Sequence, residues 1–218
     1  FLHAKGLTVY TPRLAGHGTS SKDLSTRSYN DWLDSVDRGH AILKQCCKNI
    51  LIAGFSTGAG LALLQAANKP GRFAGVISIN GPARLQDSSA KYSPVVVGWN
   101  KLLSVLHMRR GKKEFVVNDP ENPHINYSRN PVRGVYELER LMKYVRTRLP
   151  DVQGPVLVIQ GSDDPVVNPV SGTDIFSRLG SANKQLVQIS ADHHGILRGK
   201  ASDEVKEKVL IFLKSVFG

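Results

Sequence analysis

Three short stretches of the sequence contain the residue types that serine-based acyl transfer requires. A Gly-Phe-Ser-Thr-Gly motif at residues 54–58 places Ser56 between two glycines, an Asp-Asp pair follows at 163–164, and a His-His pair at 193–194. A serine hydroxyl is a weak nucleophile until a neutral imidazole accepts its proton, and a carboxylate behind the ring stabilises the imidazolium that forms. The chain order Ser, Asp, His is the one expected when the serine lies on a strand-to-helix turn.

The serine motif joins an apolar stretch at 49–55, which predicts a buried parallel strand, to a Gly/Ala/Leu-rich helix. A serine at such a junction needs strained backbone angles, so its neighbours must be small, and Gly54 and Gly58 meet that need. The same turn points the first helical amides at the space above Ser56, where an oxyanion would lie. The alternative is a tight packing corner, because the motif alone also occurs by chance.

The acidic and histidine pairs each offer two candidates. We choose Asp164 because it directly precedes Pro-Val-Val at the turn out of a strand, and His194 because it directly precedes Gly-Ile-Leu. We expect Asp163 and His193 to be exposed to solvent or to bond polar groups around the site. Two further histidines have structural interpretations: His40 lies on the apolar face of a helix, and His17 organises a turn or takes part in catalysis.

The remaining pattern alternates strands and helices, which predicts an α/β fold with a mostly parallel sheet flanked by helices. The expected strands lie at 7–10, 49–55, 73–79, 155–160 and 185–189, and helices run from 28 to about 47, from 57 to about 68, and from 202 to the end. The capping box at 28–31 begins the first of these helices. In a parallel sheet the loops after the strands gather at one edge, so Ser56, Asp164 and His194 should converge.

The alternation stops between residues 83 and 150. This part predicts a helical insertion, a small lid, between two core segments at 1–82 and 151–218. Its first helix, near 94–108, carries an apolar stripe that we expect to pack against its own domain rather than on a membrane. Its second helix carries another such stripe. The residues of the two stripes are Val95, Trp99, Leu102, Leu103 and Leu106, and then Leu138, Leu141, Met142, Val145 and Leu149.

Composition limits the partners of the protein. The 218 residues are 41% hydrophobic, enough for one core, and 29 Lys and Arg against 18 Asp and Glu give a net charge of +11. The basic run at 109–113 is expected to be a solvated loop, with contact to an anionic membrane surface as the alternative hypothesis. Nucleic-acid binding is not expected because the run lacks interleaved aromatic residues. No apolar run approaches the ~18 residues of a membrane span.

The two cysteines, Cys46 and Cys47, are adjacent in the sequence. Neighbouring cysteines in helical geometry are poorly placed to bridge each other, so no disulfide framework is expected. Two buried or half-buried thiols fit a reducing, cytoplasmic location better than a secreted one. No spacing of Cys, His or acidic residues indicates a metal site, and we expect no metal or organic cofactor.

Four segments together resemble the α/β-hydrolase superfamily, and in particular its carboxylesterase and monoacylglycerol lipase group. They are Pro-Arg-Leu-Ala-Gly-His-Gly-Thr at 12–19, Gly-Phe-Ser-Thr-Gly at 54–58, Val-Leu-Val-Ile-Gln-Gly-Ser-Asp-Asp-Pro-Val-Val at 156–167 and Asp-His-His-Gly-Ile-Leu at 192–197. The resemblance implies a serine esterase acting on a small acyl ester. Ser56 would be the nucleophile, Asp164 the acid, His194 the base, and the Thr57 amide one oxyanion donor.

The chain departs from the family pattern at its beginning. The family takes its second oxyanion amide from a loop after an earlier central strand, and residue 1 comes after that strand. We therefore expect a longer natural protein, and the fold of these residues to be N-terminally incomplete. Two rival functions stay open: an acyltransferase or thioesterase on the same fold, and a non-catalytic binding module that uses its basic surface.

Overall fold

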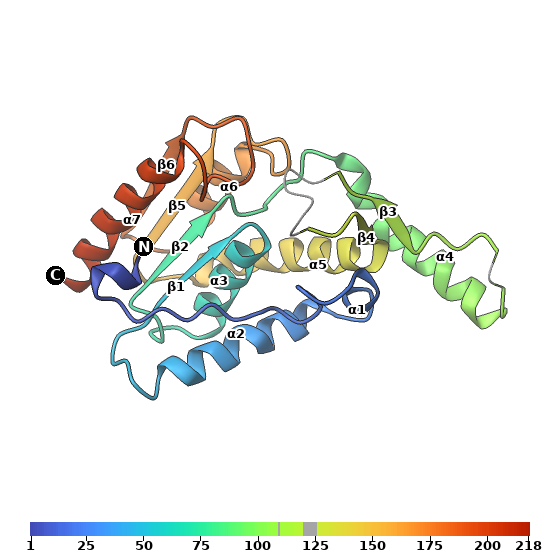
Figure 1. The fold of residues 1–218 in the computed structure, drawn as a ribbon, viewed down its shortest axis with the longest axis horizontal. Coiled ribbons are helices and arrows are strands. Elements are labelled where there is room, and N and C mark those ends of the chain that lie inside the picture. The colour runs from blue at the N-terminus through green and yellow to red at the C-terminus, as the bar shows by residue number, and fades with distance from the viewer. Residues whose placement is uncertain (109, 120–125) are drawn as a thin grey trace.

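A four-stranded parallel sheet forms the centre of the computed structural model, which describes residues 1–108, 110–119 and 126–218 (Figure 1). Its strands lie in the order β1 (Leu51–Phe55), β2 (Gly75–Ile79), β5 (Val156–Gly161) and β6 (Lys184–Ile189). Each neighbouring pair is parallel. The expected α/β fold with helices on the faces of a parallel sheet is therefore confirmed.

Helices connect these strands and cover both faces of the sheet. The α-helices are α1 (Ser21–Leu24), α2 (Tyr29–Leu43), α3 (Thr57–Asn68), α4 (Ser93–Val105), α5 (Val132–Arg148), α6 (Val170–Arg178) and α7 (Ser202–Phe217). Short 3-10 turns are η1 (His3–Lys5), η2 (Ser88–Tyr92) and η3 (Leu149–Asp151). Within the described residues, none of the helices is both long and apolar enough to cross a bilayer.

The sheet divides the core into two clusters, because successive side chains of a strand point to opposite faces. On β5, Val156 and Val158 join the cluster that contains α3, α5 and α6, whereas Leu157 and Ile159 face the cluster built on α7. All six residues of β5 are buried, as expected for an inner strand with helices on both sides. These two layers of helices fix the strand ends from which the candidate site residues emerge.

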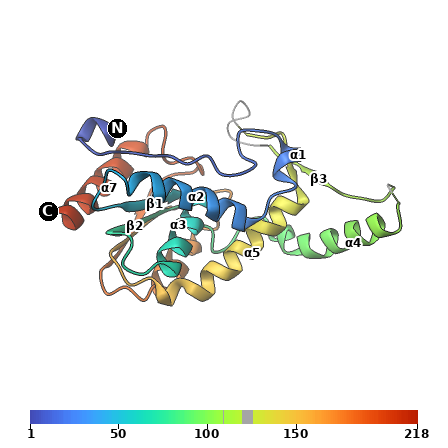
Figure 2. The same cartoon turned by 90° about the horizontal axis from the view of Figure 1, so that it is seen from below.

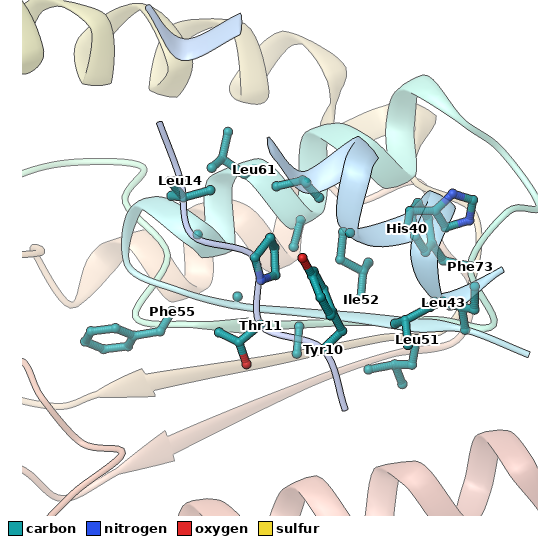
Figure 3. Close-up of a pocket in the computed structure, with 18 residues that line it drawn as sticks. Tyr10, Thr11, Leu14, His40, Leu43, Leu51, Ile52, Phe55, Leu61 and Phe73 are labelled. Atoms are coloured by element: carbon teal, nitrogen blue, oxygen red, sulfur yellow. The ribbon is translucent and has the colours of Figure 1, made fainter. Parts of the chain in front are cut away.

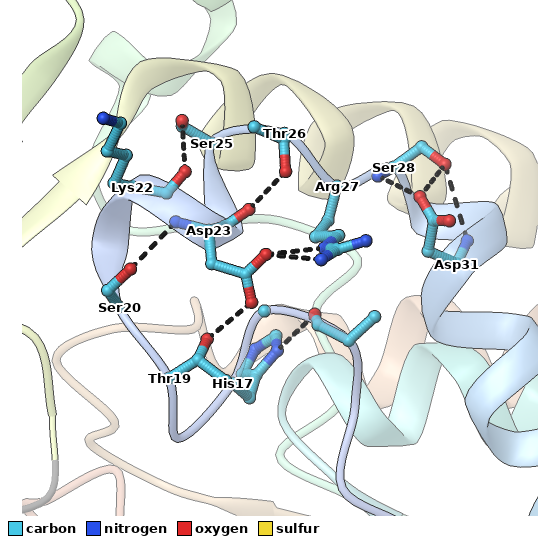
Figure 4. A network of polar contacts seen from close by, with 12 residues as sticks. His17, Thr19, Ser20, Lys22, Asp23, Ser25, Thr26, Arg27, Ser28 and Asp31 are labelled. Carbon is cyan, nitrogen blue, oxygen red and sulfur yellow. Dashed lines mark hydrogen bonds and ion pairs between the residues drawn. The ribbon is translucent and has the colours of Figure 1, made fainter.

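The start of α2 follows the sequence signal, but its end does not. Ser28 and Asp31 form the predicted capping box, in which the Ser28 hydroxyl accepts from the Asp31 amide and the Asp31 carboxylate accepts from the Ser28 amide (Figure 4). The helix ends at Leu43, where Lys44 caps it, and turns follow. The predicted extension to about residue 47 is wrong, and Cys46 is exposed rather than buried.

The strand predicted at 7–10 is absent from the described structure. These residues have no strand partner in the described ranges, and a cavity of about 250 Å³ lies between residues 10–14 and β1 (Figure 3). Tyr10, Pro12 and Leu14 line one side of the cavity, and Ile52 and Ala53 of β1 line the other. A strand is defined by its ladder of backbone hydrogen bonds, and across this gap the two backbones do not form one.

The insertion at 83–150 contains more than the predicted helices. β3 (Phe115–Val117) and β4 (Arg129–Pro131) form an antiparallel pair that sequence reasoning treated as a loop. Arg109 of the basic run and residues 120–125 of the polar stretch lie outside the described residues. α4 extends away from the body of the molecule, whereas α5 lies along α3 (Figures 1 and 2).

The two apolar stripes of the insertion have different surroundings. The α5 stripe packs into the core as expected, with Leu141 and Val145 buried beside Gly60 of α3. The prediction that the α4 stripe packs against its own domain is wrong for four of its five residues. Leu103 is buried, but the other four are 49–70% exposed. Periodicity identifies an apolar face but does not say what covers it.

Candidate active site

Ser56 occupies a strained turn between β1 and α3. Its φ of 53° and ψ of −125° lie in a region that non-glycine residues rarely adopt, and its amide donates to the Ile79 carbonyl at 2.9 Å. A Cβ at Gly54 would lie 2.0 Å from the Gly58 carbonyl oxygen, so a glycine is required there. Among the described residues, a Cβ at Gly58 would meet nothing within 4 Å beyond its own helix, so the expected steric need at that position is not found there.

The loops after β5 and β6 bring Asp164 and His194 together. The Nδ1 of His194 lies 2.7 Å from the Oδ2 of Asp164, and the other carboxylate oxygen accepts from the amides of Val166 and Val167 at 2.8 and 2.9 Å. Asp164 is fully buried, and the His194 side chain is 14% exposed. The carboxylate therefore fixes the orientation of the His194 imidazole.

The charge state of Asp164 follows from two opposing effects. Burial raises the pKa of this carboxyl, but hydrogen bonds from His194 and from the amides of Val167 and Val166 outweigh it, and the pKa lies below its usual value. Asp164 is therefore ionised at neutral pH. An ionised carboxylate bonded to Nδ1 requires that nitrogen to carry a hydrogen, which leaves Nε2 of a neutral ring as the proton acceptor.

Strand β1 ends beside this pair. The ring of Phe55, the last residue of β1, lies 4.8 Å from the His194 ring between centroids, with 39° between the planes. Ser56 follows Phe55 directly, and Thr57 is the first residue of α3, whose first-turn amides have no partner within the helix. The structure thus gathers the ends of β1, β5 and β6 at one edge of the sheet.

The alternative residues of each pair have other surroundings. Asp163 is exposed and accepts from the Ser162 hydroxyl at 2.6 Å, and the His193 Nδ1 lies 3.2 Å from the exposed carboxylate of Asp192. The predicted exposure of Asp163 is confirmed, and His193 has a side chain 35% exposed. Neither residue takes part in the bond between the two chosen side chains.

His17 and His40, the two further histidines considered from the sequence, pack against aromatic rings. His17 lies edge-on to Trp32 with 5.7 Å between centroids, and its Nδ1 is 3.3 Å from the Ala15 carbonyl oxygen (Figure 4). Burial lowers the pKa of His17, which keeps the ring neutral. His40 lies edge-on to Phe73 with centroids 5.1 Å apart. These contacts favour the turn-organising interpretation of His17 and the packing interpretation of His40.

Sequence reasoning missed two polar residues that contact the loops bearing Asp164 and His194. The Asn80 Nδ2 donates to the His194 carbonyl at 2.8 Å, and the Gln86 Nε2 donates to the Asp164 carbonyl at 3.2 Å. An Asn-Gly-Pro sequence at the end of a strand indicates only a break, so no sequence signal identified these contacts. In the described ranges no group of three or more His, Cys, Asp or Glu side chains is arranged to hold a metal ion.

Comparison with known proteins places this geometry in a family. The model of the family described as serine aminopeptidase, S33, matches residues 1–201, and the chain belongs to that family. A thermostable monoacylglycerol lipase of Bacillus sp. (strain H-257) is 30% identical over 192 residues, which is 87% of this chain and 72% of the relative. A carboxylesterase of Bacillus subtilis (strain 168) is 24% identical over 99% of this chain and 85% of its own length.

Solved structures agree on the fold. A structure reported under the heading of LipS and LipT, two metagenome-derived lipolytic enzymes, superposes with a TM-score of 0.85 at 24% identity, over 98% of this chain and 84% of the other. A soluble variant of monoglyceride lipase from Saccharomyces cerevisiae, in complex with a substrate analogue, gives 0.70 at 16% identity over 93% and 75%. The fold is that of the α/β-hydrolase superfamily, as the sequence motifs predicted.

Proposed function

We propose that this protein hydrolyses carboxylic esters through an acyl-enzyme on Ser56. The observation that carries the proposal is the bond of 2.7 Å between the buried Asp164 carboxylate and His194, beside the strained turn that presents Ser56. Relatives named as a monoacylglycerol lipase and a carboxylesterase support the class of reaction. At this coarser level, the chain is an ester-hydrolysing α/β-hydrolase.

Four groups have separate roles in the proposed reaction. His194 Nε2 takes the proton of the Ser56 hydroxyl as the oxygen bonds to the ester carbonyl carbon, and returns it to the leaving alcohol when the tetrahedral intermediate collapses. Water then attacks the acyl-enzyme, gives its proton to the same nitrogen, and the acid is released as Ser56 recovers its proton. Asp164 stabilises the imidazolium in both halves, and the Thr57 amide donates to the developing oxyanion.

Ester hydrolysis is tested with p-nitrophenyl esters of graded acyl length and with 1-monoacylglycerols, comparing the protein with its Ser56→Ala variant. The proposal expects hydrolysis that disappears in the variant. Activity that survives Ser56→Ala contradicts the nucleophile assignment. Added alcohols or thioester substrates separate the acyltransferase and thioesterase rivals, because these rivals predict acyl transfer to the alcohol or preferential thioester cleavage. A folded protein that cleaves none of these substrates favours the binding-module interpretation.

We further propose that the insertion at 83–150 acts as a lid and that α4 rests on an anionic lipid surface. Apolar side chains on one side of α4 are about half exposed or more, including Trp99 at 52% and Leu102 at 49%. Exposed cations follow the helix at Arg110 and Lys113. An exposed apolar face with cations beside it is the pattern of an interfacial helix, and the net charge of +11 adds long-range attraction to anionic headgroups.

Sedimentation with phosphatidylcholine vesicles, with and without phosphatidylserine, tests the lipid contact. We expect Trp99→Ser with Leu102→Ser to weaken binding to both vesicles about tenfold or more, and Arg110→Gln with Lys113→Gln to weaken binding only to the anionic vesicles. Exposed apolar Ile211 of α7 provides a control, since Ile211→Ser should leave binding unchanged. Equal binding by all variants overturns the proposal.

A further inference from the structure

The end of β2 touches each strand end of the candidate site. The Ile79 carbonyl accepts from the Ser56 amide at 2.9 Å, and the Asn80 amide donates to the Ile159 carbonyl of β5 at 2.9 Å. β2 lies between β1 and β5 in the sheet. Its end therefore contacts both the strand that precedes Ser56 and the strand that leads to Asp164. Main-chain bonds alone already tie two of the three segments together here.

The side chain of Asn80 reaches the third segment. Its Oδ1 accepts from the Gly161 amide at 2.8 Å, and its Nδ2 donates to the His194 carbonyl at 2.8 Å. Gly161 is the last residue of β5, three residues before Asp164. One amide therefore joins the backbone that leads to Asp164 to the backbone that carries the His194 ring.

The position demands an asparagine for two physical reasons. Asn80 has a φ of +45°, a region in which asparagine and aspartate are enriched among residues with a side chain. It is also completely buried, and its two partners are a backbone N–H and a backbone C=O, so the side chain must both accept and donate. If either bond is lost, the buried Nδ2 or Oδ1 atom of Asn80 is left without that partner. An unsatisfied buried polar atom destabilises the fold.

We propose that Asn80 is a positioning residue that holds the His194 loop in register with Asp164 and Ser56. This inference rests on the proposed hydrolase function, because His194 is the base of that reaction. Asn80 does not itself touch the reacting atoms. It sets where the His194 main chain lies, and displacement of a catalytic group by about 1 Å can lower a rate by about a hundredfold.

Two substitutions separate the side-chain bonds from the backbone strain. Asn80→Gly keeps the positive φ accessible and removes both bonds, and we expect kcat to fall about tenfold to a hundredfold with KM within about twofold. Asn80→Asp keeps the acceptor for Gly161, but donates to His194 only while protonated. Burial raises the pKa of such a carboxyl. The loss of rate in Asn80→Asp, measured relative to the parent protein, should therefore grow as pH rises, whereas that of Asn80→Gly should not.

Gln65 supplies the matched control. Its side-chain amide is also buried, at 2% exposure, and its Nε2 donates to the Leu33 carbonyl at 3.2 Å, away from the loops bearing Asp164 and His194. Gln65→Ala should lower the melting temperature and leave kcat unchanged. The positioning role is overturned if Asn80→Gly retains the parent kcat, or if its losses in kcat and stability merely match those of Gln65→Ala.

Amide hydrogen exchange keeps this test independent of the proposed reaction. In folded Asn80→Gly we expect faster exchange at Gly161 and at Ile196, whose amide also donates to the His194 carbonyl at 2.9 Å, and unchanged exchange in α7. If the parent protein cleaves no ester, the proposed function fails, and unchanged exchange at both amides overturns the loop-holding role by itself. Faster exchange at both supports that role, whatever reaction the site performs.

Discussion

The two sides of β1 are held in different ways. Toward β2, the strand is paired in parallel register from Leu51 opposite Gly75 to Phe55 opposite Ile79. Toward the N-terminal segment, it faces a cavity of about 250 Å³ whose lining includes Tyr10 and Pro12 (Figure 3). Within residues 1–218, Ser56 therefore follows a strand that is paired on one side only.

Asp164 and His194 belong to the other half, because they follow β5 and β6. β5 lies between β2 and β6, all six of its residues are buried, and Asp164 beyond it accepts three hydrogen bonds, from His194, Val166 and Val167. Buried polar groups that are fully bonded position a site more firmly than apolar contacts along a strand edge. We therefore expect substitutions on the β5 side to lower kcat and the free energy of unfolding more than substitutions on the cavity side.

The largest effect is expected from the carboxylate. Asp164→Asn should lower kcat by about four orders of magnitude at neutral pH, because an amide at this position favours the wrong tautomer of His194. Steady-state hydrolysis of a p-nitrophenyl ester measures the effect. The neighbouring Asp163→Asn, at an exposed position, should stay within about threefold of the parent protein. Equal losses in the two variants would show that we chose the wrong aspartate.

Core truncations on the two halves should differ in their free energy of unfolding. Leu157→Ala on β5 removes a side chain that is 1% exposed and should cost about 3–4 kcal/mol. Ile52→Ala on β1 removes a half-buried side chain beside an existing cavity and should cost about 1–2 kcal/mol. Urea denaturation of both variants measures the difference. A larger cost for Ile52→Ala contradicts the contrast between the two sides.

Exchange along β1 provides a finer test. Ile50 and Ser56 bond to β2 through their backbone groups, and alternate residues of a strand point to opposite edges, so the amides of Ala53 and Phe55 point toward the cavity. Nuclear magnetic resonance on a protein made of residues 1–218 alone should show that these two amides exchange at least about tenfold faster than those of Ile52 and Gly54. Uniform protection along the strand would mean that the cavity edge is closed in solution.

The smallest effect concerns pH and stability near the N-terminal loop. Burial lowers the pKa of His17 below its ordinary value of 6.5, so the unfolded state takes up the proton first as pH falls. This contribution to stability is complete above the unfolded pKa and is lost as pH falls below it. Between pH 7 and 5, His17→Gln should lose less stability than the parent protein in thermal or urea unfolding. An unchanged pH dependence contradicts the burial of a neutral ring.

Local sequence signals predicted much of the fold. The capping box began α2 at the expected residue, the apolar runs located the four strands of the main sheet, and the alternation of elements gave their parallel arrangement. The order of the motifs also predicted that Asp164 and His194 would meet, as they do at 2.7 Å. The catalytic roles of these residues stay a prediction.

The features that sequence reasoning missed depend on contacts distant in the chain. Residues 7–10 have strand-like composition but no partner backbone among the residues that the structure describes. β3 and β4 are three residues each, too short for a two-residue period to show. The exposed face of α4 has the same periodicity as the buried face of α5. Asn80 is an ordinary strand-breaking residue in the sequence, and its two partners lie 81 and 114 positions away.

Fluorophosphonate labelling with mass mapping of the adduct tests the central claim most directly. The measurement is made on the full gene product that contains residues 1–218, with His194→Ala and Ser162→Ala variants beside it. We expect one adduct on Ser56, lost or greatly slowed in His194→Ala and unchanged in Ser162→Ala, whose hydroxyl bonds Asp163 outside the proposed triad. A folded protein without an adduct, or with its adduct on another serine, would contradict the assignment of Ser56 as the nucleophile.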